Sequence, residues 1–155
     1  MLLTPHALVG ASIGASTENI PLIIILGIAS HYFLDAIPHF DWGTWHNYEP
    51  NFKLEKKDYT LLSVDVIVLM ILLFWIWTKW SYNIYIGVGI FSAVLIDLID
   101  NVPFWKHNLR KTSIGKIIHN IHTKVHFYIK PKYWFWGVLT QFTVIILCLY
   151  YLMLR

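Results

Sequence analysis

Two imidazoles and two carboxylates gather at the end of an apolar stretch, in the sequence Ser-His-Tyr-Phe-Leu-Asp-Ala-Ile-Pro-His-Phe-Asp. His31 and Asp35 are four residues apart, so on a helix they share one face, with Cβ atoms roughly 5–6 Å apart. Pro38 ends that helix, which lets His39 and Asp41 fold back toward the same point. Imidazole and carboxylate together suit zinc, iron or manganese, and a catalytic zinc keeps three protein ligands and one open position.

This segment therefore predicts half of a metal site. His31 and Asp35 are its strongest members, and Asp41 is the weakest, since it resembles an ordinary loop residue. The alternative is structural: His31 hydrogen-bonds a neighbouring helix and Asp35 caps helix ends.

A second group of histidines recurs at helical spacing: His119, His122 and His126. At 100° per residue they occupy an arc of roughly 60°. Apolar residues fill the neighbouring arc, while Lys116 and Lys124 point elsewhere, which is typical of an amphipathic helix on an anionic membrane surface. We expect His119 and His122 to be metal ligands and His126 to act as a general acid. A merely polar or pH-sensitive interfacial helix is the alternative.

Ionisable residues also lie within apolar runs, where they are costly and tend to be functional. Asp97 and Asp100 are three residues apart and share a helix face. Together with Asp65 they could be ligands, or could orient histidines by accepting the other ring N–H; helix–helix hydrogen bonding is the alternative. We expect Asp65 and Asp97 to be ligands, and either Asp35 or Asp100 to be a general base. His6 opens the first helix, where its neutral, metal-binding form is favoured.

Composition indicates a membrane protein. Of the 155 residues, 57% are hydrophobic and only 14% are charged, the mean hydropathy is +0.55, and soluble domains average about 25% charged residues. The length suits a single integral-membrane domain over residues 1–155. The single cysteine, Cys148, cannot form an internal disulfide. No nucleic-acid motif occurs in the sequence, so we expect the lipid bilayer as partner and no nucleic acid.

The pattern of apolar runs and breakers predicts an all-α, polytopic membrane helical bundle. About five membrane helices are expected, the first of them short, at residues 5–16, 20–37, 59–77, 83–102 and 134–154. A further amphipathic helix lies on the cytoplasmic side. In the first helix Gly10 and Gly14 have the G-x-x-x-G spacing that permits close backbone contact.

The distribution of basic residues predicts the orientation. Ten of the twelve lysines and arginines fall in the segments 38–58 and 104–133. By the positive-inside rule, the N-terminus and both long loops are cytoplasmic and the C-terminus is outside a prokaryotic inner membrane. All eight histidines then belong to the cytoplasmic half.

The early Thr-Pro-His motif, followed by the histidine and aspartate segment described above, resembles a known family. It is similar to the small inner-membrane metal-dependent hydrolases of the YdjM, LexA-binding type. The resemblance covers roughly the first 45 residues well and the rest in outline. It implies a hydrolase, and it implies a set of metal ligands: His6, His31, Asp35, His39 and His122. The family usually has Pro-Asp-x-Asp-His, whereas this chain has Asp35-x-x-Pro38-His39-x-Asp41.

We therefore expect a metal-dependent hydrolase acting on a lipid or lipid-linked ester or phosphoester at the cytoplasmic leaflet. Zinc is the expected metal, with iron or manganese as alternatives, and it would activate a water molecule. Two other functions stay open: a di-iron redox enzyme of the desaturase or hydroxylase kind, and a divalent-metal or proton carrier.

Overall fold

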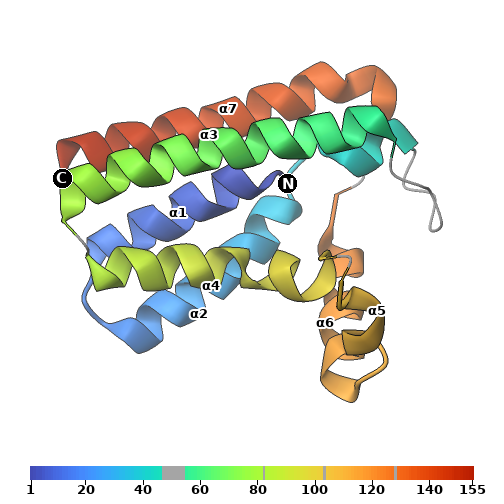
Figure 1. Cartoon of the computed structure of the whole chain (residues 1–155), viewed down its shortest axis with the longest axis horizontal. Helices are drawn as coiled ribbons and strands as arrows, with labels where there is room; N and C mark the ends of the chain where they lie inside the picture. The colour runs from blue at the N-terminus through green and yellow to red at the C-terminus, as the bar shows by residue number, and fades with distance from the viewer. Residues whose placement is uncertain (47–54, 82, 103, 128) are drawn as a thin grey trace.

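The protein is all-α in a computed structural model that describes residues 1–46, 55–81, 83–102, 104–127 and 129–155 (Figure 1). These residues form seven α-helices and two short 3₁₀ helices, and no strand. In chain order the elements are α1 (Leu3–Ser16), α2 (Ile20–Asp35), η1 (Trp42–His46), α3 (Lys56–Trp80), α4 (Ile84–Asp100), α5 (Lys106–Leu109), α6 (Ser113–Val125), η2 (Pro131–Tyr133) and α7 (Trp134–Leu154).

Polar residues define the starts of the helices that carry the site. The Asn19 side chain accepts a hydrogen bond from the Leu22 N–H at the start of α2. Asn83 caps α4 in the same way, and Thr112 accepts from the Gly115 N–H at the start of α6. Such side chains satisfy backbone donors that have no partner in the first helical turn.

Helix α1 lies at the centre of the bundle and contacts α2, α3, α4 and α7. Its closest neighbour is α4: a Cβ on Gly10 would collide with the Gly89 carbonyl, and one on Gly14 with the Tyr85 carbonyl. The predicted close contact at the G-x-x-x-G spacing is confirmed. Because α1 and α4 are antiparallel here, the beginning of α1 lies beside the end of α4.

Two of the described helices are long and apolar enough to cross a membrane: α3, and the stretch Pro131–Leu154 that includes α7. Helices α1, α2 and α4 have 14, 16 and 17 residues, fewer than the roughly 20 that a membrane span needs. The expectation of about five membrane helices is thus supported for two, and for the other three it stays a prediction. Large apolar side chains such as Met70 and Phe142 are exposed on α3 and α7.

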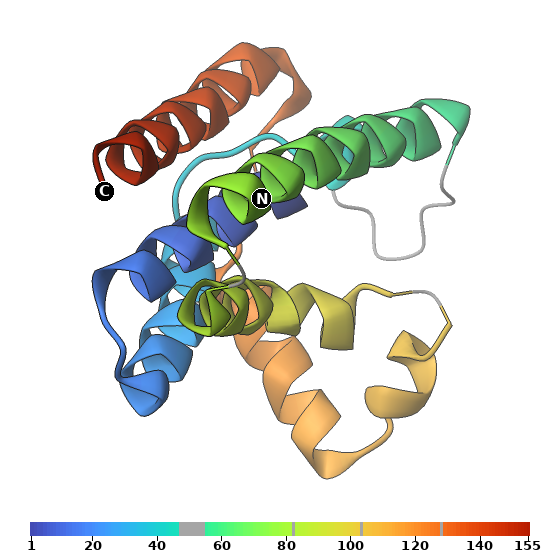
Figure 2. The ribbon, with the colours of Figure 1, turned by 60° about the vertical axis from the view of Figure 1, so that its left-hand side comes forward.

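Helices α3 and α7 diverge from each other, and helices α5 and α6 lie away from both. Helices α3 and α7 overlap in Figure 1 but are separated along most of their lengths in Figure 2. Their last turns meet, where the Lys79 ammonium donates to the carbonyls of Leu152 and Met153. Helices α5 and α6 project away from α3 and α7 in both views.

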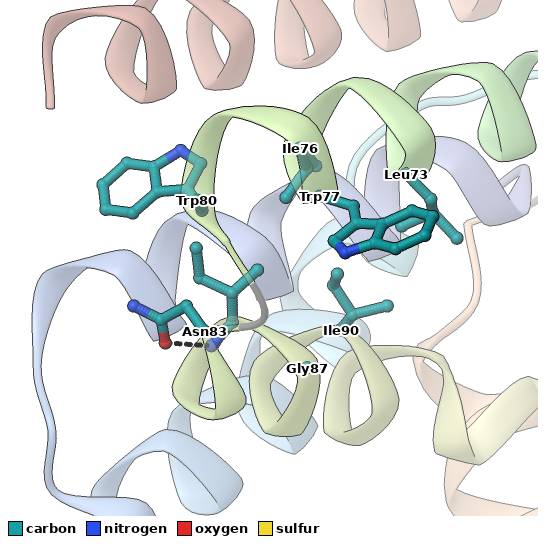
Figure 3. Close-up of a pocket in the computed structure, with 8 residues that line it drawn as sticks. Leu73, Ile76, Trp77, Trp80, Asn83, Gly87 and Ile90 are labelled. Carbon is teal, nitrogen blue, oxygen red and sulfur yellow. Dashed lines mark hydrogen bonds between the residues drawn. The ribbon is translucent and has the colours of Figure 1, made fainter.

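A cavity of about 150 Å³ lies between the end of α3 and the first half of α4. Trp77 and Ile90 line it, and Asn83 contributes an amide side chain (Figure 3). The ionisable residues at the other end of α4 do not line this cavity. The cavity is therefore separate from the candidate metal-binding residues.

Candidate metal centre

The histidines and aspartates meet where the start of α1, the end of α2, the end of α4 and helix α6 come together. Four of these side chains are completely buried: His6, His31, Asp35 and His39. Ionisable groups are almost never buried so deeply unless they are paired or bind a metal. The burial of four together marks this cluster as the candidate functional site.

The carboxylate of Asp35 is the centre of the cluster, and its two oxygens face different partners. Oδ2 lies 2.9 Å from Nε2 of His122 and 3.2 Å from Nε2 of His31. Oδ1 lies 3.2 Å from Nε2 of His6 and 4.0 Å from Nε2 of His39. The Met1 amino group also donates to Oδ1, at 2.5 Å. One carboxylate therefore faces four imidazoles.

His31 is held in one tautomer by the neighbouring helix. Its Nδ1 lies 2.8 Å from the carbonyl oxygen of Ala93 in α4. Since a carbonyl only accepts, Nδ1 carries the proton and donates, which leaves a lone pair on Nε2 of the neutral ring. That lone pair faces the carboxylate of Asp35. Two acceptors at this distance require a positive charge between them, either a proton or a metal ion.

His39 shows the same arrangement in the segment after α2. Its Nδ1 donates to the Ile37 carbonyl at 2.8 Å, and its Nε2 lies 3.2 Å from Nε2 of His126. Oδ2 of Asp41 lies 3.3 Å from the same atom of His126 and 3.8 Å from that of His39. Asp41, expected to be the weakest member, is buried and faces both histidines.

His122 lies between two carboxylates. Its Nδ1 is 3.0 Å from Asp100 and its Nε2 is 2.9 Å from Asp35. Burial alone would lower the pKa of His122, but these hydrogen bonds raise the pKa to about 9. The pair Asp100–His122 has the geometry of a carboxylate that orients a metal-binding imidazole through its other nitrogen.

Asp100, expected to be a general base or to orient a histidine, is buried. Its carboxylate accepts from Nε of Arg110 at 2.7 Å and lies 3.0 Å from Nδ1 of His119. Three donors therefore surround it: Arg110, His119 and His122. His119, expected to be a ligand, contacts Asp100 and is about one-third exposed in its side chain.

Two groups of ligand atoms emerge, one facing each carboxylate oxygen of Asp35. We name the first the His31 group: His31, His122 and Asp97. We name the second the His39 group: His39, His126 and Asp41. Three sets of possible ligand atoms each lie within 4.8 Å of one another: His31–Asp35–His122, Asp35–His39–His126 and His6–His31–Asp97. The buried histidines and aspartates could therefore hold a metal ion.

Asp65 has a different environment from these groups. Its carboxylate accepts from the backbone N–H groups of Leu3 at 2.7 Å and Thr4 at 3.3 Å, at the start of α1. These contacts correspond to the hydrogen-bonding alternative for this residue, since they satisfy donors of the first turn.

Sequence reasoning missed two residues of α7 that support the segment after α2. Gln141 donates to the Phe40 carbonyl at 2.7 Å and accepts from the Leu2 N–H. Gly137 lies against the backbone of His39 and Phe40, where a Cβ would collide. A glutamine inside an apolar helix was the available signal, because polar groups there are rarely without a partner.

No protein-family model matches the chain, and no curated protein or solved structure is similar enough to count as a match. The resemblance to the YdjM-type hydrolases therefore stays a hypothesis.

Proposed function

We propose that the protein is a metal-dependent membrane hydrolase that acts on a lipid or lipid-linked phosphoester at the cytoplasmic leaflet. One observation carries the proposal: the Nε2 atoms of His31 and His122 converge on Asp35, while the opposite ring nitrogens are held by an acceptor. Histidines that bind metals show this arrangement.

The interatomic distances support a metal site. Two ligands of one tetrahedral zinc ion lie about 3.3 Å apart when the metal–ligand bonds are roughly 2.0–2.1 Å long. Oδ2 of Asp35 lies 3.2 Å from His31 and 2.9 Å from His122. A divalent ion there would lower the pKa of bound water and polarise a phosphoryl oxygen.

Residues around the centre would bind the headgroup of the substrate and protonate the leaving group. Lys116 and Lys124 are exposed on α6, where an anionic headgroup can reach them. His119 has the most exposed side chain of the clustered histidines. A leaving group can therefore reach His119, which takes the general-acid role expected of His126. Asp100 holds both His119 and His122 and thereby fixes the acid relative to the metal ligands.

The apolar helices support the membrane location. In helix α3 and in the Pro131–Leu154 stretch, less than a quarter of the most apolar 18-residue segment is buried inside the protein. Such surfaces are stable when lipid covers them. The distribution of lysines and arginines supports an inner-membrane orientation with the cluster on the cytoplasmic side.

A di-iron redox enzyme is the second candidate, because two histidines and two carboxylates per group also suit iron. Oxygen-dependent product formation by iron-loaded protein would favour it. A carrier is less well supported, since carriers place their sites near the bilayer midplane, whereas this cluster lies at the ends of α2 and α4.

The test is metal content followed by hydrolysis. Protein purified in detergent is analysed for zinc, iron and manganese, and then assayed for phosphate release from vesicles of phosphatidic acid and phosphatidylcholine. We expect a stoichiometric metal that His31→Ala removes. The matched control is His107→Ala, an exposed histidine on α5. Metal-free wild-type protein, or unchanged metal content in His31→Ala, would contradict the proposal.

A further inference from the structure

The number of possible ligands in the cluster exceeds what one ion can bind. The His31 group and the His39 group each offer two Nε2 atoms and one aspartate, and Asp35 adds one oxygen to each. A tetrahedral zinc ion takes four ligands, and octahedral ions take six. The two groups and Asp35 together offer eight ligand atoms, and Nε2 of His6 lies 3.2 Å from Oδ1 of Asp35 as a ninth. This number fits two ions better than one.

The two groups are built alike. In the His31 group, Nε2 of His31 and of His122 lie 3.9 and 4.0 Å from Oδ1 of Asp97. In the His39 group, the corresponding distances from Oδ2 of Asp41 are 3.8 Å for His39 and 3.3 Å for His126. Each group therefore has two imidazoles and a terminal carboxylate of its own.

The orientation of Asp35 connects the groups. Oδ2 faces the His31 group and Oδ1 faces His39. A carboxylate that binds one cation with each oxygen acts as a bridge, and paired catalytic metal ions lie about 3.5–4 Å apart. The two possible ligand sets that contain these histidine pairs have only Asp35 in common.

We propose that Asp35 bridges two divalent cations, one held by the His31 group and the other by the His39 group. The inference rests on the proposed metal-dependent function and gives a physical reason for its phosphoester substrate. Paired ions stabilise both the attacking and the leaving oxygen of an in-line displacement, so a phosphoester is the substrate that this centre fits.

The cations bind in a defined order. Oδ1 of Asp35 lies 4.0 Å from Nε2 of His39, the nearest ring nitrogen that the His39 group offers it. Oδ2 already lies near two ring nitrogens of the His31 group. The His31 group is therefore filled first, and the His39 group is the weaker site.

The experiment counts manganese ions and tests whether they are coupled. Detergent-purified full-length protein is stripped with chelator, loaded with Mn²⁺, desalted and analysed for metal per chain and by electron paramagnetic resonance. We expect two ions per wild-type chain with an exchange-coupled spectrum. His39→Ala should retain one ion with an uncoupled spectrum, and Asp35→Asn should lose the coupling.

Further variants distinguish the bridged centre from the proposed metal-dependent hydrolase. His107→Ala should keep two coupled ions. If His39→Ala does not fold, Asp41→Asn replaces it, because its amide oxygen can still accept from the Thr44 N–H, as the carboxylate does at 3.0 Å. One ion per wild-type chain, or two ions without coupling, overturns the bridged centre while leaving a metal-dependent hydrolase intact. No bound ion overturns both.

Discussion

Nε2 of His122 and Oδ2 of Asp35 lie 2.9 Å apart although 87 residues separate them in the chain. This contact joins the end of α2 to helix α6. Asp100, at the end of α4, holds the other nitrogen of the His122 ring, and the Phe127 N–H, just after α6, donates to the Asp35 carbonyl at 2.7 Å.

Replacing Asp100 tests this support. Asp100→Asn keeps the size of the side chain but removes the charge that pairs with Arg110 and orients His122. Loss of such a partner costs about 10–100-fold in metal affinity. Competition with a fluorescent zinc chelator measures the affinity. Glu18→Gln is the acidic control, because Glu18 is exposed between the end of α1 and the start of α2, the opposite ends of these helices from the site. Unchanged affinity would show that Asp100 does not orient a ligand.

The contact between α1 and α4 predicts a contrast between two glycines. Gly10→Ala places a methyl group against the Gly89 carbonyl, whereas a Cβ on Gly87 meets nothing within 4 Å. Overpacking costs about 1–3 kcal/mol, while alanine at an open helical position stabilises by roughly 0.5–1 kcal/mol. Thermal unfolding in detergent should therefore move in opposite directions for Gly10→Ala and Gly87→Ala.

Gln141 provides a test of how α7 holds the segment that carries His39. Gln141→Leu leaves the Phe40 carbonyl and the Leu2 N–H without their hydrogen bonds. Each unsatisfied buried group costs about 1–3 kcal/mol, so we expect lower thermal stability and weaker metal binding. Thr143→Val, an exposed change on the same helix, should alter neither. Full metal affinity in Gln141→Leu would show that this contact from α7 does not support the metal centre.

Replacing Asp65 distinguishes a capping role from a ligand role for this residue. Asp65→Ala removes the acceptor for the Leu3 and Thr4 N–H groups, and loss of a capping acceptor costs about 0.5–2 kcal/mol. We expect reduced thermal stability with an unchanged number of bound metal ions. A loss of metal without a loss of stability would instead identify Asp65 as a ligand.

The sequence by itself determined the helices and the strongest members of the site. Apolar runs and breakers placed α1, α2, α4 and α7 close to their observed bounds, because local periodicity and capping depend on neighbouring residues. The four-residue spacing of His31 and Asp35 likewise brought them together, at 3.2 Å.

Only the tertiary structure decided which distant residues join them and in what role. Asp41 became a close partner of His39 because Gln141 and Gly137 hold its segment from α7. Asp65 contacts the start of α1, where backbone N–H groups need acceptors. These roles depend on contacts between helices far apart in the chain, which spacing along one helix does not encode.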